Sequence, residues 1–187
     1  MVKQIKLAIV GGSSSGKTTL FKELEEEYKN NPDVAFVHES AREYFLSNPS
    51  SDPFILEVQE KILDLALENE KSATLKNSKI IVTDTSALEV MFYTKVRGDE
   101  KGAERLYKRL ASYIPSYTKF LLLNHAEVPF ENDIVRKEDK DTRDKIHQML
   151  EAFYKNNDLE FEKINGTIDQ RRKKVSAIIL KYLEHEE

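Results

Sequence analysis

One glycine–serine stretch near the start of the chain constrains the fold more than any other feature of the sequence. Residues 11–18 read GGSSSGKT and fit the pattern G-x-x-x-x-G-K-[ST], the phosphate-binding P-loop. The stretch follows the short apolar run IKLAIV and precedes a segment in which apolar residues recur with helical spacing. A P-loop needs this order, because its backbone N–H groups converge on an anion between a buried strand and a helix N-terminus. The stretch therefore predicts an α/β protein that binds a nucleotide.

The residue types in this stretch suit contact with phosphate. Gly11 and Gly16 permit backbone angles and close approaches that a side chain would block. Lys17 is placed to span the β- and γ-phosphates, and the Thr18 hydroxyl is placed to bind Mg²⁺. We therefore expect ATP and Mg²⁺ as cofactors. The residues expected to hold the nucleotide here are Gly11, Gly12, Ser13, Ser14, Ser15, Gly16, Lys17, Thr18 and Thr19.

Apolar runs alternate with helical periodicity along the rest of the chain. After the first strand at 5–10, further strands are expected at 33–38, 79–84, 119–124 and 160–166. Helices are expected at 17–30, 41–45, 55–75, 88–96 and 101–112, in a segment ending near 156, and at 168–183. Strands alternating with helices favour a parallel sheet covered on both faces. We predict a three-layer α/β fold that forms a single domain over residues 1–187.

The composition excludes several classes of protein. The chain has no cysteine, which excludes disulfides, thiolate zinc sites and cysteine nucleophiles. Its net charge of −4 argues against broad electrostatic binding to nucleic acid. No apolar run approaches the roughly 20 residues of a membrane span, and the N-terminal residues do not resemble a signal peptide. We expect a cytoplasmic monomer or homodimer that acts on a small molecule, without a membrane or nucleic-acid partner.

Two carboxylates follow predicted strands, at the edge of the sheet where open α/β folds bind ligands. Asp84 ends the run at 79–84 and would hold Mg²⁺ with Thr18; the alternative is a cap for the next helix. Glu39 would accept the proton of an acceptor hydroxyl; the alternative is a surface glutamate near a helix start. Arg42, one helical turn beyond Glu39, would either reach the same cleft or lie in solvent.

The segment 131–145 mixes charges of both signs densely. Such a segment usually forms a solvated helix face, but in a phosphotransferase a mobile lid lies after the fourth strand. Arg136 and Arg143 would then close on the phosphates and stabilise the transferred charge. Gly166, in the loop after the last strand, is expected near the P-loop and the base. The basic run at 171–174 is expected to be a solvated helix face.

Several stretches together resemble the NadR-type family of AAA-like P-loop ATPases, whose best understood branch is the ribosylnicotinamide kinase domain. They cover nearly the whole chain and read GGSSSGKTTL, HESAREYF, IVTDTSA, KFLLLNHAEVPF and VRKEDKDTR, followed by HQMLEAFYKNNDLEFEKING. The resemblance implies a strand order of 2-3-1-4-5 and transfer of the ATP γ-phosphate to a nucleoside hydroxyl. It also implies that Glu39, Arg42, Tyr44 and Asp84 lie at the acceptor and Arg136 near the lid. The family's adenylyltransferase and DNA-binding domains have no counterpart here, so we expect a stand-alone unit.

Two other classes of P-loop protein compete with a kinase. A GTPase needs N-K-x-D after the fourth strand and D-x-x-G after the third, where this chain has NHAE and DTSA. The sequence therefore argues against a guanine-specific switch. An ATPase coupled to a protein or nucleic-acid partner stays open as an alternative, although no helical lid domain follows the core and the net charge is acidic. Side-chain identity alone does not name the acceptor.

Overall fold

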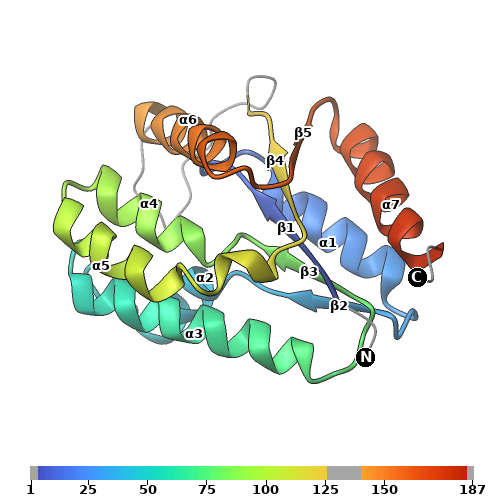
Figure 1. Ribbon diagram of the computed structural model, residues 1–187, viewed down its shortest axis with the longest axis horizontal. Helices are drawn as coiled ribbons and strands as arrows, with labels where there is room; N and C mark the ends of the chain where they lie inside the picture. The colour runs from blue at the N-terminus through green and yellow to red at the C-terminus, as the bar shows by residue number, and fades with distance from the viewer. Residues whose placement is uncertain (1–3, 126–139, 185–187) are drawn as a thin grey trace.

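In the computed structural model, which describes residues 4–125 and 140–184, a parallel sheet forms the middle layer (Figure 1). Its strands pair in the order β2-β3-β1-β4-β5, as the family resemblance predicts. The strands are β1 (Ile5–Val10), β2 (Val34–Val37), β3 (Ile80–Asp84), β4 (Lys119–Leu123) and β5 (Phe161–Ile164). The P-loop directly follows β1, which lies in the centre of the sheet.

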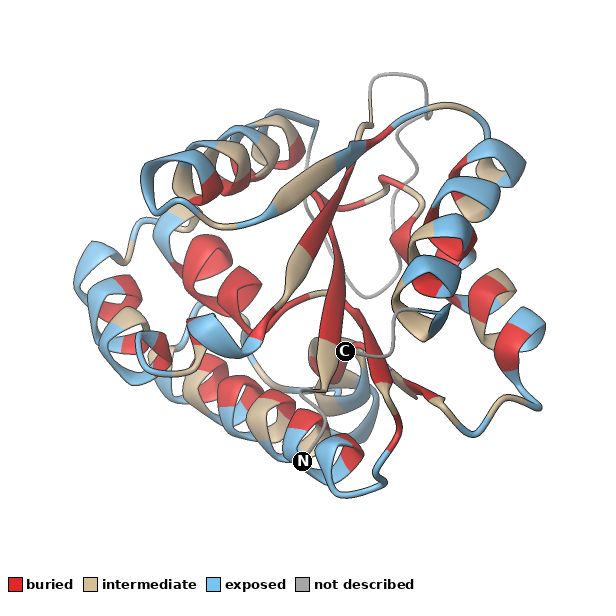
Figure 2. Ribbon diagram, turned by 45° about the vertical axis from the view of Figure 1, so that its right-hand side comes forward, coloured by how far each residue is buried: buried red, intermediate tan, exposed pale blue. Residues whose placement is uncertain are grey.

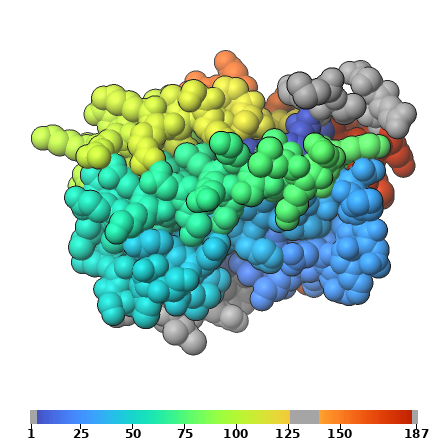
Figure 3. Space-filling view, turned by 90° about the horizontal axis from the view of Figure 1, so that it is seen from below, coloured from blue at the N-terminus to red at the C-terminus, as the bar shows by residue number. Residues whose placement is uncertain are grey.

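Helices cover both faces of the sheet, which gives the expected three layers. One face is covered by α1 (Lys17–Tyr28) and α7 (Ile168–Glu184), and the other by α3 (Leu56–Thr74), α4 (Leu88–Val96), α5 (Glu100–Leu110) and α6 (Lys140–Asn156) (Figure 1). The short α2 (Ser40–Ser47) packs on α3, and a 3-10 turn, η1 (Ile114–Ser116), precedes β4. Seen from below, α3 crosses the molecule between α2 and α5 (Figure 3).

The central strand is apolar except for Lys6, because both of its faces are buried. Leu7 and Ile9 pack among the residues of α1 and α7, whereas Ala8 and Val10 pack among those of α3, α4 and α6. Successive side chains of a strand point to opposite faces, so a strand between two helical layers has no solvent-facing set. Figure 2 shows the central strands mostly in red, the colour of buried residues.

Element boundaries differ from the expected ones by a few residues. Helix α2 runs on to Ser47, beyond the expected end at residue 45. Strand β5 ends at Ile164 instead of 166, because Gly166 turns the chain with a φ of 97°. Asp99 caps α5 by accepting a hydrogen bond of 2.8 Å from the Gly102 N–H.

In the described parts of the chain, no helix combines the length and apolar character needed to cross a membrane.

A buried ion pair joins the sheet to the helical layer. Lys6 Nζ in β1 lies 2.9 Å from Glu70 Oε2 in α3, and both side chains are almost fully buried. The hydroxyls of Tyr113 and Tyr117 donate to the Glu70 carboxylate at 2.9 and 2.7 Å. The Tyr117 hydroxyl in turn accepts the Ala87 N–H, at the start of α4, at 2.9 Å. This network holds β1, α3 and α4 together.

Loss of one member of this pair should destabilise the protein strongly. We expect Lys6→Met to lower the free energy of unfolding by about 3 kcal/mol, because the Glu70 carboxylate is then buried without its cation. The double variant Lys6→Met/Glu70→Leu should recover part of that loss. Urea denaturation followed by circular dichroism measures both.

The control is Lys108→Met, which removes an exposed partner of Glu104 and should leave the midpoint unchanged. A Lys6→Met protein as stable as the wild type would contradict the stabilising role of the buried pair.

Candidate active site

The P-loop adopts a backbone conformation that turns its amides inward. Gly11, Ser14 and Gly16 have positive φ angles of 149°, 54° and 86°. Such alternation of backbone conformation forms a concave nest of N–H groups, and the helix α1 begins directly after it. Position 12 requires glycine for a steric reason, since a Cβ there would lie 2.6 Å from the Arg143 carbonyl oxygen. The loop therefore has the shape of an anion site.

Polar side chains of the loop are buried around this nest. Lys17 Nζ donates to the carbonyls of Gly11 and Gly12 at 2.7 and 2.9 Å, which holds the ammonium against the loop. The hydroxyls of Ser13 and Ser15 are buried and have no hydrogen-bond partner among the described residues. Buried polar atoms without partners are rare in proteins and often mark a ligand site. The loop thus presents positive charge and hydroxyl donors to an anionic ligand.

Asp84 lies at the end of β3 beside this loop. Its Oδ2 accepts a hydrogen bond of 3.0 Å from the Thr18 hydroxyl, and its buried Oδ1 has no hydrogen-bond partner in the described chain. Burial raises the pKa of the Asp84 carboxyl above its ordinary value of 3.8, against the opposing effects of Lys17 and Thr18. The alternative of a helix cap is wrong, because Ala87 occupies the N-cap of α4.

The oxygen donors of Thr18 and Asp84 suit Mg²⁺. This ion prefers hard oxygen ligands and usually takes only one or two from the protein, with phosphate and water completing its shell. In the regions 4–125 and 140–184, no group of three or more histidine, aspartate or glutamate side chains converges as a metal site. The pair therefore fits a metal that arrives with a nucleotide better than a metal held by the protein alone.

Backbone strain follows Asp84. Thr85 has a φ of 74°, a region that β-branched residues seldom adopt and that costs about 1–3 kcal/mol. The strained residue is held by two contacts, since its N–H donates to the Ile9 carbonyl at 3.0 Å and its carbonyl accepts the Thr83 hydroxyl at 2.5 Å. Strain of this kind concentrates at functional sites.

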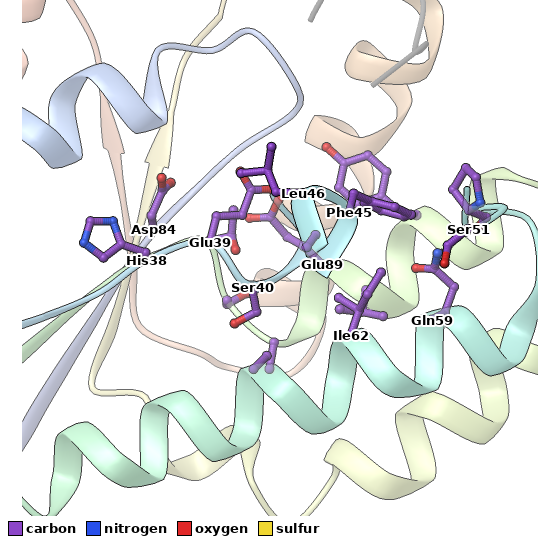
Figure 4. Close-up of a pocket in the computed structure, with 18 of the residues that line it drawn as sticks. His38, Glu39, Ser40, Phe45, Leu46, Ser51, Gln59, Ile62, Asp84 and Glu89 are labelled. Carbon is purple, nitrogen blue, oxygen red and sulfur yellow. Dashed lines mark hydrogen bonds between the residues drawn. The ribbon is translucent and has the colours of Figure 1, made fainter. Parts of the chain in front are cut away.

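A cavity of about 580 Å³ opens next to Asp84. Figure 4 shows His38, Glu39 and Asp84 at one end of it and Ser51 and Gln59 toward the other. Apolar side chains line the space between them, among them Phe45, Ile62, Val90 and Tyr93. Its volume lies within the range of about 300–1,000 Å³ typical of small-molecule sites.

Glu39 is buried at the end of this cavity, so it is not a surface residue. It occupies the N-cap position of α2, yet its side chain makes no capping hydrogen bond. Its Oε2 lies 3.7 Å from Arg42 Nε, and the Arg42 side chain is about one-third exposed. The carboxylate is thus held near the P-loop end of the cavity with a cation beside it.

Two buried glutamates in the cavity wall have no counterpart among the candidates from the sequence. They are Glu70, from α3, and Glu89, from α4. Nothing local distinguishes Glu70 from the exposed Glu68 of the same helix, since only packing decides which face of α3 turns inward. Glu89 stands in the apolar run LEVMFY, a signal of a buried helix that could have marked it. Tyr44, a sequence candidate, is not among the described residues that line the cavity; its ring contacts Phe45 edge-on at 5.7 Å.

Arg143 lies in the first turns of α6, buried against Gly12 of the P-loop. Its Nε donates to Asp144 Oδ1 at 3.3 Å, and the same oxygen lies 2.8 Å from His125 Nε2. Burial and the charge of Arg143 lower the pKa of His125. Arg136 and the first part of the expected lid lie outside the described residues.

The expectation that the whole basic run 171–174 is solvated is wrong for its first member. The Arg171 side chain is fully buried beneath the P-loop, because three backbone carbonyls there accept its hydrogen bonds. One of these carbonyls belongs to Gly166, so the loop at the end of β5 lies close to the P-loop, as predicted.

Comparison with known proteins agrees with this geometry. A family model described as an AAA domain matches residues 6–171. Among solved structures, NadR in complex with NAD and AMP-PNP superposes with a TM-score of 0.76 at 17% identity, over 99% of this chain and 51% of that one. The chain therefore spans about half the length of the NadR structure that it matches. A search of curated protein sequences finds no match.

Two kinases of similar fold match over nearly their full length. Deoxyadenosine kinase from M. mycoides has a TM-score of 0.64 at 17% identity, covering 95% of this chain and 100% of that chain. Thymidylate kinase from Candida albicans has a TM-score of 0.67 at 16% identity, covering 98% and 94%. At these identities the likeness establishes the fold, which is that of the P-loop kinases.

The buried Asp84 carboxyl should make stability depend on pH. We expect nucleotide-free Asp84→Asn to unfold at a higher temperature than the wild type at neutral pH, because the variant does not bury a carboxylate. An acid with a raised folded-state pKa stabilises the fold fully only below its unfolded-state pKa, and this stability is lost as pH rises through the folded pKa. The advantage of the variant should therefore shrink as pH falls through the raised pKa toward 3.8.

Thermal unfolding of both proteins at a series of pH values measures this difference. The matched control is Asp141→Asn on the exposed face of α6, for which no rise is expected. A gain for Asp84→Asn that stays constant down to the acid limit of folding would contradict the role of the buried charge.

Proposed function

The chain belongs to the AAA-domain family, and from this premise we propose that it transfers the γ-phosphate of ATP to a hydroxyl group of a small molecule. We propose a nucleoside, such as ribosylnicotinamide, as the acceptor class. One observation carries the proposal: Asp84, which accepts a hydrogen bond from Thr18 of the P-loop, also lines a cavity whose nearest end holds Glu39.

The cavity favours a kinase over a protein that only hydrolyses ATP. Transfer to an acceptor needs a water-poor space beside the γ-phosphate and a group that receives the acceptor proton. The cavity is of small-molecule size, and the buried Glu39 lies at the end where the phosphate would be. Its apolar walls, which include Phe45 and Tyr93, suit the flat ring of a nucleoside.

The proposed reaction gives each of these residues a role. The acceptor oxygen forms a bond to the γ-phosphorus, the bond from that phosphorus to the β,γ-bridging oxygen breaks, and ADP leaves. Glu39 takes the proton of the acceptor hydroxyl, while Arg42 beside it orients the carboxylate. Lys17 releases the loop carbonyls and contacts the β- and γ-phosphates.

Thr18 and Asp84 would hold Mg²⁺, which neutralises phosphate charge when it is bound with ATP. Arg143, buried beside the P-loop, would add positive charge on the α6 side. Arg136, which lies outside the described residues, would act as a lid residue. Tyr44 would act at the acceptor site only indirectly, since the described cavity does not include it.

The solved structures of similar fold support the choice of acceptor class. NadR is described in complex with NR, and also with NAD and AMP-PNP. Deoxyadenosine kinase is described with bound dATP. These descriptions pair the fold with bound nucleotides, which supports a nucleoside as the acceptor.

Nucleoside-dependent ATP consumption is the direct test. We expect one member of a nucleoside panel that includes ribosylnicotinamide to stimulate ATP consumption by the purified protein and to give a monophosphate product. Lys17→Ala should abolish the activity, because the loop then lacks the cation that spans the phosphates. Product analysis by chromatography, with and without EDTA, also tests the need for Mg²⁺.

ATP hydrolysis that is equal with every nucleoside and rises only when a protein or nucleic acid is added would contradict the kinase proposal. It would favour instead an ATPase coupled to such a partner.

The role of Glu39 can be separated from folding and from ATP binding. We expect Glu39→Gln to lower kcat by about 10²–10⁴-fold while the affinity for ATP stays unchanged, because the amide cannot take the proton. The matched control is Glu43→Gln, one turn further along α2 and exposed, which should keep the wild-type kcat. An unchanged kcat in Glu39→Gln would remove Glu39 as the base.

A further inference from the structure

The buried guanidinium of Arg171 joins three loops at the nucleotide edge of the sheet. Its Nη1 donates to the Ser15 carbonyl at 2.8 Å, its Nη2 to the Asn124 carbonyl at 2.6 Å and its Nε to the Gly166 carbonyl at 2.7 Å. These carbonyls belong to the P-loop, to the end of β4 and to the turn between β5 and α7. Arg171 is among the largest fully buried side chains of the protein.

The position of Arg171 is electrostatically unfavourable for a merely structural residue. It is the fourth residue of α7, near a helix N-terminus, where the helix dipole disfavours a cation. Burial of a cation adds a desolvation cost. The three carbonyl dipoles offset these costs and hold the positive charge of the guanidinium directly beneath the anion nest.

The contact with Ser15 reaches the nest through one peptide group. The Ser15 carbonyl and the Gly16 N–H belong to the same peptide unit, and Gly16 is a loop residue at the N-terminus of α1. Hydrogen bonds in a chain polarise one another, so a charged donor on the carbonyl makes the N–H of that unit a stronger donor. A Cβ built on Gly16 would lie only 3.6 Å from Arg171 Nη1, which shows how closely the guanidinium lies under the loop.

We propose that Arg171 is a positioning residue of the phosphate site, which strengthens phosphate binding by polarising the Ser15–Gly16 peptide and by aligning the loops at Asn124 and Gly166 with it. The inference rests on the proposed binding of ATP and extends it to a residue that touches no phosphate.

The next residue of the same helix supplies a matched control. Arg172 has the same charge but is partly exposed, and it pairs with Glu27 at 2.6 Å and Asp169 at 2.9 Å. A change at Arg172 removes one positive charge from α7 without a contact to the P-loop. It therefore reports the effect of net charge alone.

Isothermal titration with tripolyphosphate and with ATP, both in Mg²⁺, measures binding to the phosphate site without and with the nucleoside part. We expect Arg171→Gln to bind tripolyphosphate about tenfold more weakly than the wild type, the loss typical of a hydrogen bond to a charged group. Arg171→Lys, which keeps the charge, should fall between the two. Arg172→Gln should bind like the wild type. All variants are titrated at a temperature at which circular dichroism shows them folded.

Distinct outcomes overturn distinct claims. A wild type that binds neither ATP nor tripolyphosphate overturns the proposed function and this inference with it. A wild type that binds both, with Arg171→Gln equal to it, overturns the inference alone, as does an equal loss in Arg172→Gln. A purely structural Arg171 would lower the thermal midpoint of both its variants and leave their tripolyphosphate affinity unchanged. If Arg171→Gln does not fold, Arg171→Lys carries the test: we expect severalfold weaker binding, and unchanged affinity overturns the proposal.

Discussion

The parallel pairing of β1 with β3 is the constraint on which the rest of the site depends. Its register sets Ile9 opposite Asp84, so both strands end at the same level of the sheet. The chain leaving β1 becomes the P-loop, and the chain leaving β3 passes through the strained Thr85, whose N–H bonds back to Ile9. One register therefore places Thr18 within hydrogen-bond distance of Asp84 although 66 positions separate them in the sequence.

Polar groups at this edge lack the partners that a stable core would supply. The hydroxyls of Ser13 and Ser15 and one oxygen of Asp84 are buried without hydrogen-bond partners in the described chain, and Asp84 carries a raised pKa. Each such group costs stability in the nucleotide-free protein. The cost is concentrated where a phosphate and its metal would satisfy these atoms, which fits a site organised before its ligand arrives.

Buried charged side chains also join segments of the chain that are distant in sequence. Lys6 with Glu70 joins β1 to α3, and the tyrosines of that network reach the start of α4. Arg171 joins the loops on the other side of the P-loop. In both cases one cation gathers oxygen atoms from segments distant in sequence. The P-loop and the cavity beside it thus lie between two buried networks of charged side chains.

The sequence by itself determined the strands, their alternation with helices, the P-loop and the expectation that Asp84 and Glu39 meet beside it. These follow from local rules, because apolar runs define buried strands and parallel strands present their carboxyl ends at one edge. The strand order came from resemblance to a family. Only the tertiary structure decided the inward positions of Glu70, Glu89 and Arg171. A charged residue enters the interior when distant segments supply its partners, and no local pattern in the sequence records where those segments meet.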